Sequence, residues 1–191
     1  TRKESSAASD VYKRQELKIA PKMQISNRQQ YSWHIDQKES FRLIGKSKTF
    51  SCKNGEHCLQ IPEFWSECHA RGDTAKLISL DRGNPKGIFG LFTDFCEQRD
   101  ETVYSIMVIS DQEAPPGFDE IVIPPAAWAV FDCHGKIPQS IHHGWKYLNE
   151  EWLIKYPFKH APCPELEWYS DGDQTSDTYK AQIWIPIIEE R

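Results

Sequence analysis

The stretch that decides the fold is residues 128–152, which read WAVFDCHGKIPQSIHHGWKYLNEEW. Its first part completes a strand predicted for residues 120–133, in which Trp128 and Val130 point to one face. A helix is predicted from Pro138, because proline is tolerated at the first helical position, where its missing N–H has no partner. The apolar stripe of this helix, at i, i+4, i+7 and i+11, consists of Ile141, Trp145, Leu148 and Trp152.

The same plan occurs earlier in the chain, so that residues 40–109 and 119–188 are two copies of one β-α-β-β unit. The first copy has a strand at 40–50 and a helix predicted to begin at Pro62. The stripe of that helix consists of Ile61, Phe64, Trp65 and Cys68. The strands that close the two copies are predicted at 87–95, 102–110, 165–169 and 179–188. We therefore expect an α+β fold: one antiparallel sheet, two helices on one face and a ligand groove at the pseudo-twofold seam.

Composition limits the classes of function. Of the 191 residues, 39% are hydrophobic and 12% aromatic, and the formal net charge is −5. An acidic chain is a poor nucleic-acid binder by itself, since DNA affinity depends mainly on lysine and arginine. No apolar run reaches the roughly 18 residues of a membrane span. The six cysteines have no metal-site spacing, so no metal or cofactor is predicted, and a cytoplasmic location is expected.

The N-terminal residues differ in character from the rest. Residues 10–15 read DVYKRQ, the string that a common sequencing-library transposon end encodes when it is read in frame. We expect residues 1–15 to be a non-native or disordered tail and residues 16–30 a linker. The binding domain is then predicted at 31–191, with half-units at about 31–110 and 118–188.

Aromatic residues and carboxylates carry the candidate chemistry. Tyr104, Trp128 and Tyr179 stand at equivalent places in the duplicated plan. On the strand at 165–169, alternation puts Glu165, Glu167 and Tyr169 on one face and Leu166 and Trp168 on the other. If the glutamate face lies in the seam, a carboxylate among aromatic rings suits a lipophilic cation. Alternation alone equally allows this face to be plain solvent-exposed surface.

Four segments resemble the GyrI-like small-molecule-binding domain, the effector-binding domain of AraC-type and MerR-type regulators. They are IPEFW (61–65), PPAAWAVF (124–131), PELEWY (164–169) and QIWIP (182–186). The resemblance covers residues 31–188 and implies a duplicated sheet around an aromatic pocket with a buried glutamate at its base. By motif, that glutamate is Glu167, with Glu165 as the alternative. The aromatic walls are then Tyr104, Trp128 and Tyr179, with Phe64 and Trp65 from the first helix and Tyr169 beside the glutamates.

Two further segments bear on the context. LKIAPK (17–22) is similar to the tail that connects an AraC-type DNA-binding domain to this module. Many AraC-linked relatives have glutamate where this chain has Gln182, which puts a role for a second carboxylate there in doubt.

Three functions are compatible with this reading. The first is the small-molecule-sensing domain of an AraC-type transcriptional regulator, with DNA as a partner only through a missing N-terminal helix-turn-helix domain. The second is a stand-alone protein that sequesters a ligand, and the third is a hydrolase of reactive cyclopropanoid compounds, as some relatives are. The sequence has no Gly-x-Ser-x-Gly, His-Glu-x-x-His or phosphate-loop motif, so no catalytic residue is assigned.

Overall fold

The structure is a computed structural model, which describes residues 31–96, 99–156 and 158–189. The tail predicted at 1–15 and the linker predicted at 16–30 lie outside the described residues.

The described residues form one antiparallel sheet of nine strands, which confirms the predicted α+β class. The strands are β1 (Trp33–Lys38), β2 (Phe41–Ser51), β3 (Ile88–Cys96), β4 (Glu101–Ile109), β5 (Asp119–Ile123), β6 (Ala126–His134), β7 (Phe158–His160), β8 (Leu166–Tyr169) and β9 (Lys180–Glu189). Their order is β1-β6-β9-β8-β3-β4-β2-β5, with β7 paired to β9.

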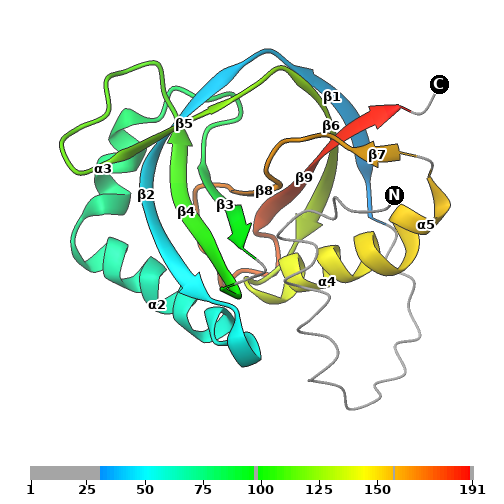
Figure 1. Cartoon of the computed structure of the whole chain (residues 1–191), viewed down its shortest axis with the longest axis horizontal. Coiled ribbons are helices and arrows are strands. Elements are labelled where there is room, and N and C mark those ends of the chain that lie inside the picture. The colour runs from blue at the N-terminus through cyan, green and yellow to red at the C-terminus, as the bar shows by residue number, and fades with distance from the viewer. Residues whose placement is uncertain (1–30, 97–98, 157, 190–191) are drawn as a thin grey trace.

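This order shows the duplication. One half contributes β2-β4-β3 and the other β6-β9-β8, and the halves meet where β3 pairs with β8. The strands that precede each half are exchanged: β1 pairs with β6 of the second half, and β5 pairs with β2 of the first. In Figure 1 these two strands cross over one end of the sheet.

The strand predicted at 120–133 is therefore two strands. It is interrupted between β5 and β6 at Pro124 and Pro125, which have no N–H to donate to a ladder. The chain bends there, and β5 leaves for the first half. The strands β1 and β7 were not predicted, because β1 precedes the first copy and β7, within the second copy, has only three residues.

Three helices cover one face of the described sheet: α2 (His57–Ala70) and α3 (Asp73–Leu80) in the first half and α4 (Gln139–Tyr147) in the second (Figure 1). A 3-10 turn, Lys53–Gly55, precedes α2; a π-helical turn, Leu148–Trp152, and the short α5 (Leu153–Lys155) follow α4. None of the described helices is long and apolar enough to cross a membrane.

The helix prediction was right for α4 and incomplete in the first half. Pro138 is the N-cap of α4, and the predicted stripe from Ile141 to Trp152 is buried. In contrast, α2 begins at His57 and contains Pro62, so its start at Pro62 was wrong. His57 is buried at the start of α2, so the helix begins ahead of the position at which proline is best tolerated. The helix α3 was missed, since eight residues give few periods to recognise.

The two faces of the sheet have separate cores. The helix-side core holds Phe64 and Cys68 of α2, Leu77 of α3, and Trp145 and Trp152 of the second half. The core on the opposite face consists of Leu43, Phe89, Leu91, Met107, Ile123, Trp128, Val130, Leu166, Trp168 and Trp184. A side chain's place in this molecule is therefore set by strand parity, which decides which core it joins.

Candidate functional site

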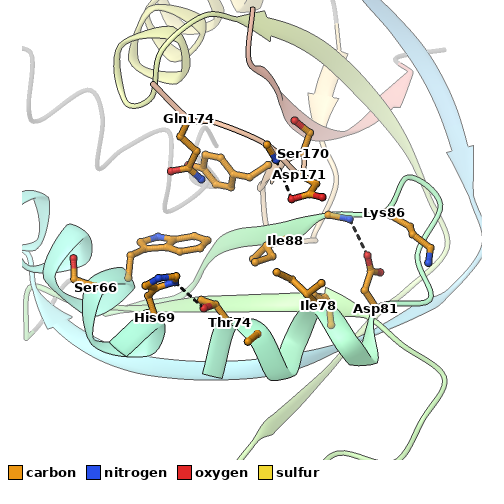
Figure 2. A pocket seen from close by; sticks show the side chains of 16 residues that line it. Ser66, His69, Thr74, Ile78, Asp81, Lys86, Ile88, Ser170, Asp171 and Gln174 are labelled. Carbon is orange, nitrogen blue, oxygen red and sulfur yellow. Dashed lines mark hydrogen bonds between the residues drawn. The ribbon is translucent and has the colours of Figure 1, made fainter. Parts of the chain in front are cut away.

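A cavity of about 710 Å³ lies on the helix side of the seam between the two halves. Residues from α2 and α3 form one wall, the segment from Tyr169 to Gln174 forms the facing wall, and the start of β3 lies between them (Figure 2). Its volume is in the range of pockets that enclose drug-sized molecules. The predicted groove at the seam is therefore present.

Glu167 is buried beside this cavity. The seam pairs it with Gly90 of β3, and its side chain is 4% exposed. Its Oε1 accepts a hydrogen bond from Trp145 Nε1 at 2.7 Å, and its Oε2 accepts one from the Tyr169 hydroxyl at 2.9 Å. The first donor comes from α4 and the second from the glutamate's own strand, so both elements fix the carboxylate.

Tyr104 of β4 adds a phenol to this group. Its hydroxyl accepts a hydrogen bond from Trp65 Nε1 at 3.1 Å. Burial, and secondarily the negative charge of Glu167, hold the pKa of Tyr104 well above its ordinary value, so the phenol stays neutral. Gly90 makes this approach possible: a Cβ there would collide with the Tyr104 hydroxyl and lie 3.4 Å from Glu167 Oε2.

Two aromatic rings separate the cavity from the carboxylate. Trp65 and Tyr169 both line the cavity, and their rings meet edge to face with centroids 5.5 Å apart. Glu167 does not line the cavity, although it binds the Tyr169 hydroxyl. A molecule in the cavity would therefore meet two ring surfaces first, with the carboxylate directly behind them.

We compared the sequence with models of known protein families. Residues 32–188 match the sequence model of the GyrI-like small molecule binding domain. The chain belongs to this family. A comparison with curated proteins found no match.

Solved structures support the GyrI-like fold. The chain is 27% identical to SAV2435 bound to tetraphenylphosphonium, with a TM-score of 0.72, covering 82% of this chain and 94% of that one. It is also 27% identical to a putative bacterial transcription regulation protein from Staphylococcus aureus MU50, with a TM-score of 0.66, covering 82% and 97%. The EcmrR C-terminal domain, 18% identical with a TM-score of 0.55 over 84% and 99%, shares the fold.

The GyrI-like site brings together four of the eight residues predicted for it. Glu167, Tyr104, Trp65 and Tyr169 form the group described above. Tyr179 is buried but does not line the cavity. Its hydroxyl donates a hydrogen bond to the carbonyl of Ser170, a residue of one cavity wall, at 2.6 Å and so stabilises that wall. Burial raises the pKa of Tyr179 as well.

Trp128 was placed wrongly at this site. It shares strand parity with Val130, which pairs with Trp184, and it packs against Trp184 with ring centroids 6.0 Å apart. Glu167 pairs with Ile183, whose side chain lies in the core on the helix side. Trp128 is therefore on the opposite face of the sheet from Glu167 and cannot surround it.

Two other predicted residues do not line the cavity of this GyrI-like domain. Phe64 is buried against Phe50, with ring centroids 5.8 Å apart. Glu165 is also buried, and its Oε1 lies 3.3 Å from His160 Nε2. Glu167 binds Tyr169 of the cavity wall, so the geometry favours it as the carboxylate of the site.

The prediction missed the wall formed by α3 and by the turn that leads to β3. Ile78, Asp81 and Lys86 line the cavity there, and His69 of α2 lies at its other end (Figure 2). The one sequence signal was Asp81 followed by Gly83, a pattern typical of a turn in which the carboxylate accepts a backbone N–H. Among the described residues, no cluster of three or more His, Cys, Asp or Glu side chains could hold a metal ion.

Proposed function

We propose that this GyrI-like domain binds lipophilic organic cations in the seam cavity and that Glu167 supplies the opposing charge. The observation that carries the proposal is the buried Glu167 carboxylate directly behind the rings of Trp65 and Tyr169. Ring faces attract a cation, and a carboxylate in a site of low dielectric attracts it further. Burial of the apolar part of the ligand adds about 25 cal/mol per Å².

The chemistry of one similar protein supports this proposal. SAV2435, 27% identical to this chain, has been solved with tetraphenylphosphonium, which is a lipophilic cation. A charge buried behind aromatic rings favours such a ligand over a neutral one of the same shape, because only the cation interacts with the carboxylate.

We further infer that binding serves a cytoplasmic transcriptional regulator of the AraC type. The support is the similarity of residues 17–22 to an AraC linker, and the likeness to the Staphylococcus aureus protein described as a putative transcription regulator. The alternative is a stand-alone binding protein. It is supported by the two most similar chains described above, of which this domain covers 94% and 97%. Sequencing the DNA upstream of residue 16 distinguishes the two.

The substitution Glu167→Gln tests the role of the charge. The amide keeps the shape of the side chain and can still accept the Trp145 hydrogen bond, but it removes the negative charge. We expect the Kd of tetraphenylphosphonium to rise roughly ten-fold or more, about 1.4 kcal/mol. The Kd of neutral triphenylphosphine oxide should change less than two-fold. Isothermal titration calorimetry measures both.

The matched control is Glu165→Gln, which removes a second buried carboxylate two residues away that does not line the cavity. It should leave the ratio of the two dissociation constants unchanged. If Glu167→Gln weakens both ligands equally, or neither, the cavity is a neutral aromatic cleft and the proposal is wrong.

A further inference from the structure

The end of the cavity away from α2 carries a second carboxylate, Asp81. It follows α3, lines the cavity and is 6% exposed. Its Oδ1 accepts a hydrogen bond from Gly83 N at 2.8 Å, and its Oδ2 accepts one from Gly87 N at 2.9 Å. Figure 2 shows Asp81 at the Lys86 end of the cavity, with Ser66 and His69 at the other.

No ion pair of Asp81 with a lysine, arginine or histidine occurs within the part of the chain that the structure describes. Two backbone N–H groups occupy two of about four lone-pair positions of a carboxylate. A buried carboxylate is costly to leave without a counter-charge, so a cation in the cavity would gain from meeting it.

Asp81 and Glu167 are held at separate points of residues 87–90, where the chain enters β3. Asp81 binds the backbone of Gly87, and Glu167 lies beside Gly90. Three residues of a strand span roughly 10 Å, which gives the approximate spacing of the two carboxylates. Ile88 lies between them and lines the cavity, so the connecting surface is apolar.

We propose that Asp81 is a second anionic subsite, which selects ligands carrying a primary ammonium or amidinium group about 10 Å from the Glu167 end. This inference rests on the proposed function, in which the lipophilic cation occupies the Glu167 end. The preferred ligand is then an extended dication with an aromatic head at one end and a hydrogen-bond-donating cation at the other. Ammonium donates up to three hydrogen bonds, which suits a carboxylate that still has free lone pairs.

The other charged groups at this end are more solvated. Lys86 and Asp171 line the cavity, but both are exposed, and Asp171 Oδ1 accepts a hydrogen bond from Gly172 N. Water and salt screen exposed charges strongly, so their effect on a bound ammonium is smaller than that of Asp81. Lys86 repels a second cation and Asp171 attracts it.

The test compares two ligands that differ in one group: (7-aminoheptyl)triphenylphosphonium, whose linker is long enough to span the two carboxylates, and octyltriphenylphosphonium. The terminal ammonium of the first replaces the terminal methyl of the second, and the amine is protonated at pH 7. We expect the wild-type protein to bind the ammonium compound about ten-fold more tightly. Asp81→Asn should abolish or reverse this preference and change the Kd of the octyl compound less than two-fold.

Two further variants keep the inference falsifiable if Asp81→Asn loosens the turn that it holds. Lys86→Gln removes the repelling cation and should raise the preference for the ammonium compound about two- to three-fold. Asp171→Asn, an exposed carboxylate at the same end, should change the preference less than two-fold. A preference that persists unchanged in Asp81→Asn, or one that disappears with Asp171→Asn, overturns the assignment to Asp81.

The result for wild type separates this inference from the proposed function. If both compounds bind with equal affinity, Asp81 is a turn-holding residue only and the cation site at Glu167 stands. If neither compound binds, both proposals are wrong.

Discussion

The two halves of the molecule repeat one strand plan but use the helix side of the sheet differently. In the second half, α4 and the π-helical turn after it bury Trp152 against Trp33, Phe131 and Phe158, with ring centroids 4.9–5.5 Å from it. In the first half, α2 turns at Gly72 into α3, and the cavity lies between these helices and the wall after β8. On the helix side of the sheet, the second half is therefore filled by aromatic side chains, whereas the first half borders the cavity.

The difference extends to the indole N–H groups that the two helices present to the seam. Trp145 of α4 donates to the Glu167 carboxylate, whereas Trp65 of α2 donates to the Tyr104 phenol. A hydrogen bond to a charged acceptor is stronger than one between neutral groups. The second half therefore fixes the carboxylate, and the first half carries the ring that would yield more easily to a ligand.

The largest effect that tests this contrast is on stability. Trp152→Ala empties a fully buried site in the second half and should cost about 3–5 kcal/mol of unfolding free energy. Ile78 lines the cavity in the first half and is 60% exposed, so Ile78→Ala should cost less than about 1 kcal/mol. Urea unfolding followed by fluorescence measures both. Equal costs would show that the two helix sides are packed alike.

Much of this contrast could be predicted from the sequence. The stripe from Ile141 to Trp152 has a clear helical period, and the duplicated plan gives the antiparallel sheet. The exchange of β1 and β5 could not be predicted, because strand patterns do not say which strand is the neighbour. Pro124 and Pro125 marked the break, but a proline pair also fits a bend within one strand.

The next test uses two glycines, one in each half. A Cβ at Gly144 of α4 would lie 2.6 Å from Cys133 Sγ and 2.8 Å from Ile183 Cδ1, so Gly144→Ala should push the helix from the sheet. We expect a cost of about 2 kcal/mol, within the usual range for overpacking. At Gly72 no atom lies within 4 Å of such a Cβ, and only the left-handed backbone, φ +80°, opposes alanine.

Gly72→Ala should therefore cost about 1 kcal/mol, the backbone term alone. The two variants also differ in binding: displacement of α4 moves Trp145 away from Glu167, so Gly144→Ala should weaken tetraphenylphosphonium as well as the fold. If Gly72→Ala destabilises the protein more than Gly144→Ala, the second half is not the tightly packed one.

The candidate site was predictable only in part, because alternation relates side chains within one strand but not side chains on different strands. Alternation grouped Glu167 and Tyr169 correctly, since both lie on β8, whereas Glu165 precedes that strand. It could not relate Trp128 to Glu167, because that relation depends on the register of three strands across β6, β9 and β8. Asp81 was out of reach for a different reason: it lies between elements, where no period applies.

The last effect is on the pH dependence of stability, and it concerns one buried thiol in each half. Burial, and secondarily Glu167, raise the pKa of Cys133 in β6 to about 12. Burial also raises the pKa of Cys68 in α2, but the Arg71 side chain, which donates to its Sγ, opposes the shift. The second-half thiol is thus the one that should resist ionisation more.

The sign of the effect follows from proton binding. Above its unfolded pKa, near 9, an unfolded Cys133 loses its proton while the folded protein keeps it, so alkaline pH favours unfolding. The stabilisation is complete below pH 9 and is lost as the pH rises towards 12. Over that window the unfolding free energy should fall by on the order of 1 kcal/mol per pH unit for this thiol.

Cys133→Ala should remove this slope, and Cys68→Ala should remove less of it. Urea midpoints at pH 7.5 and 10.5 compare the variants, each against its own value at pH 7.5, so that the loss of packing cancels. Parallel pH profiles for wild type and Cys133→Ala would contradict the prediction, and a larger change for Cys68→Ala would assign the thiol with the more strongly raised pKa to the first half.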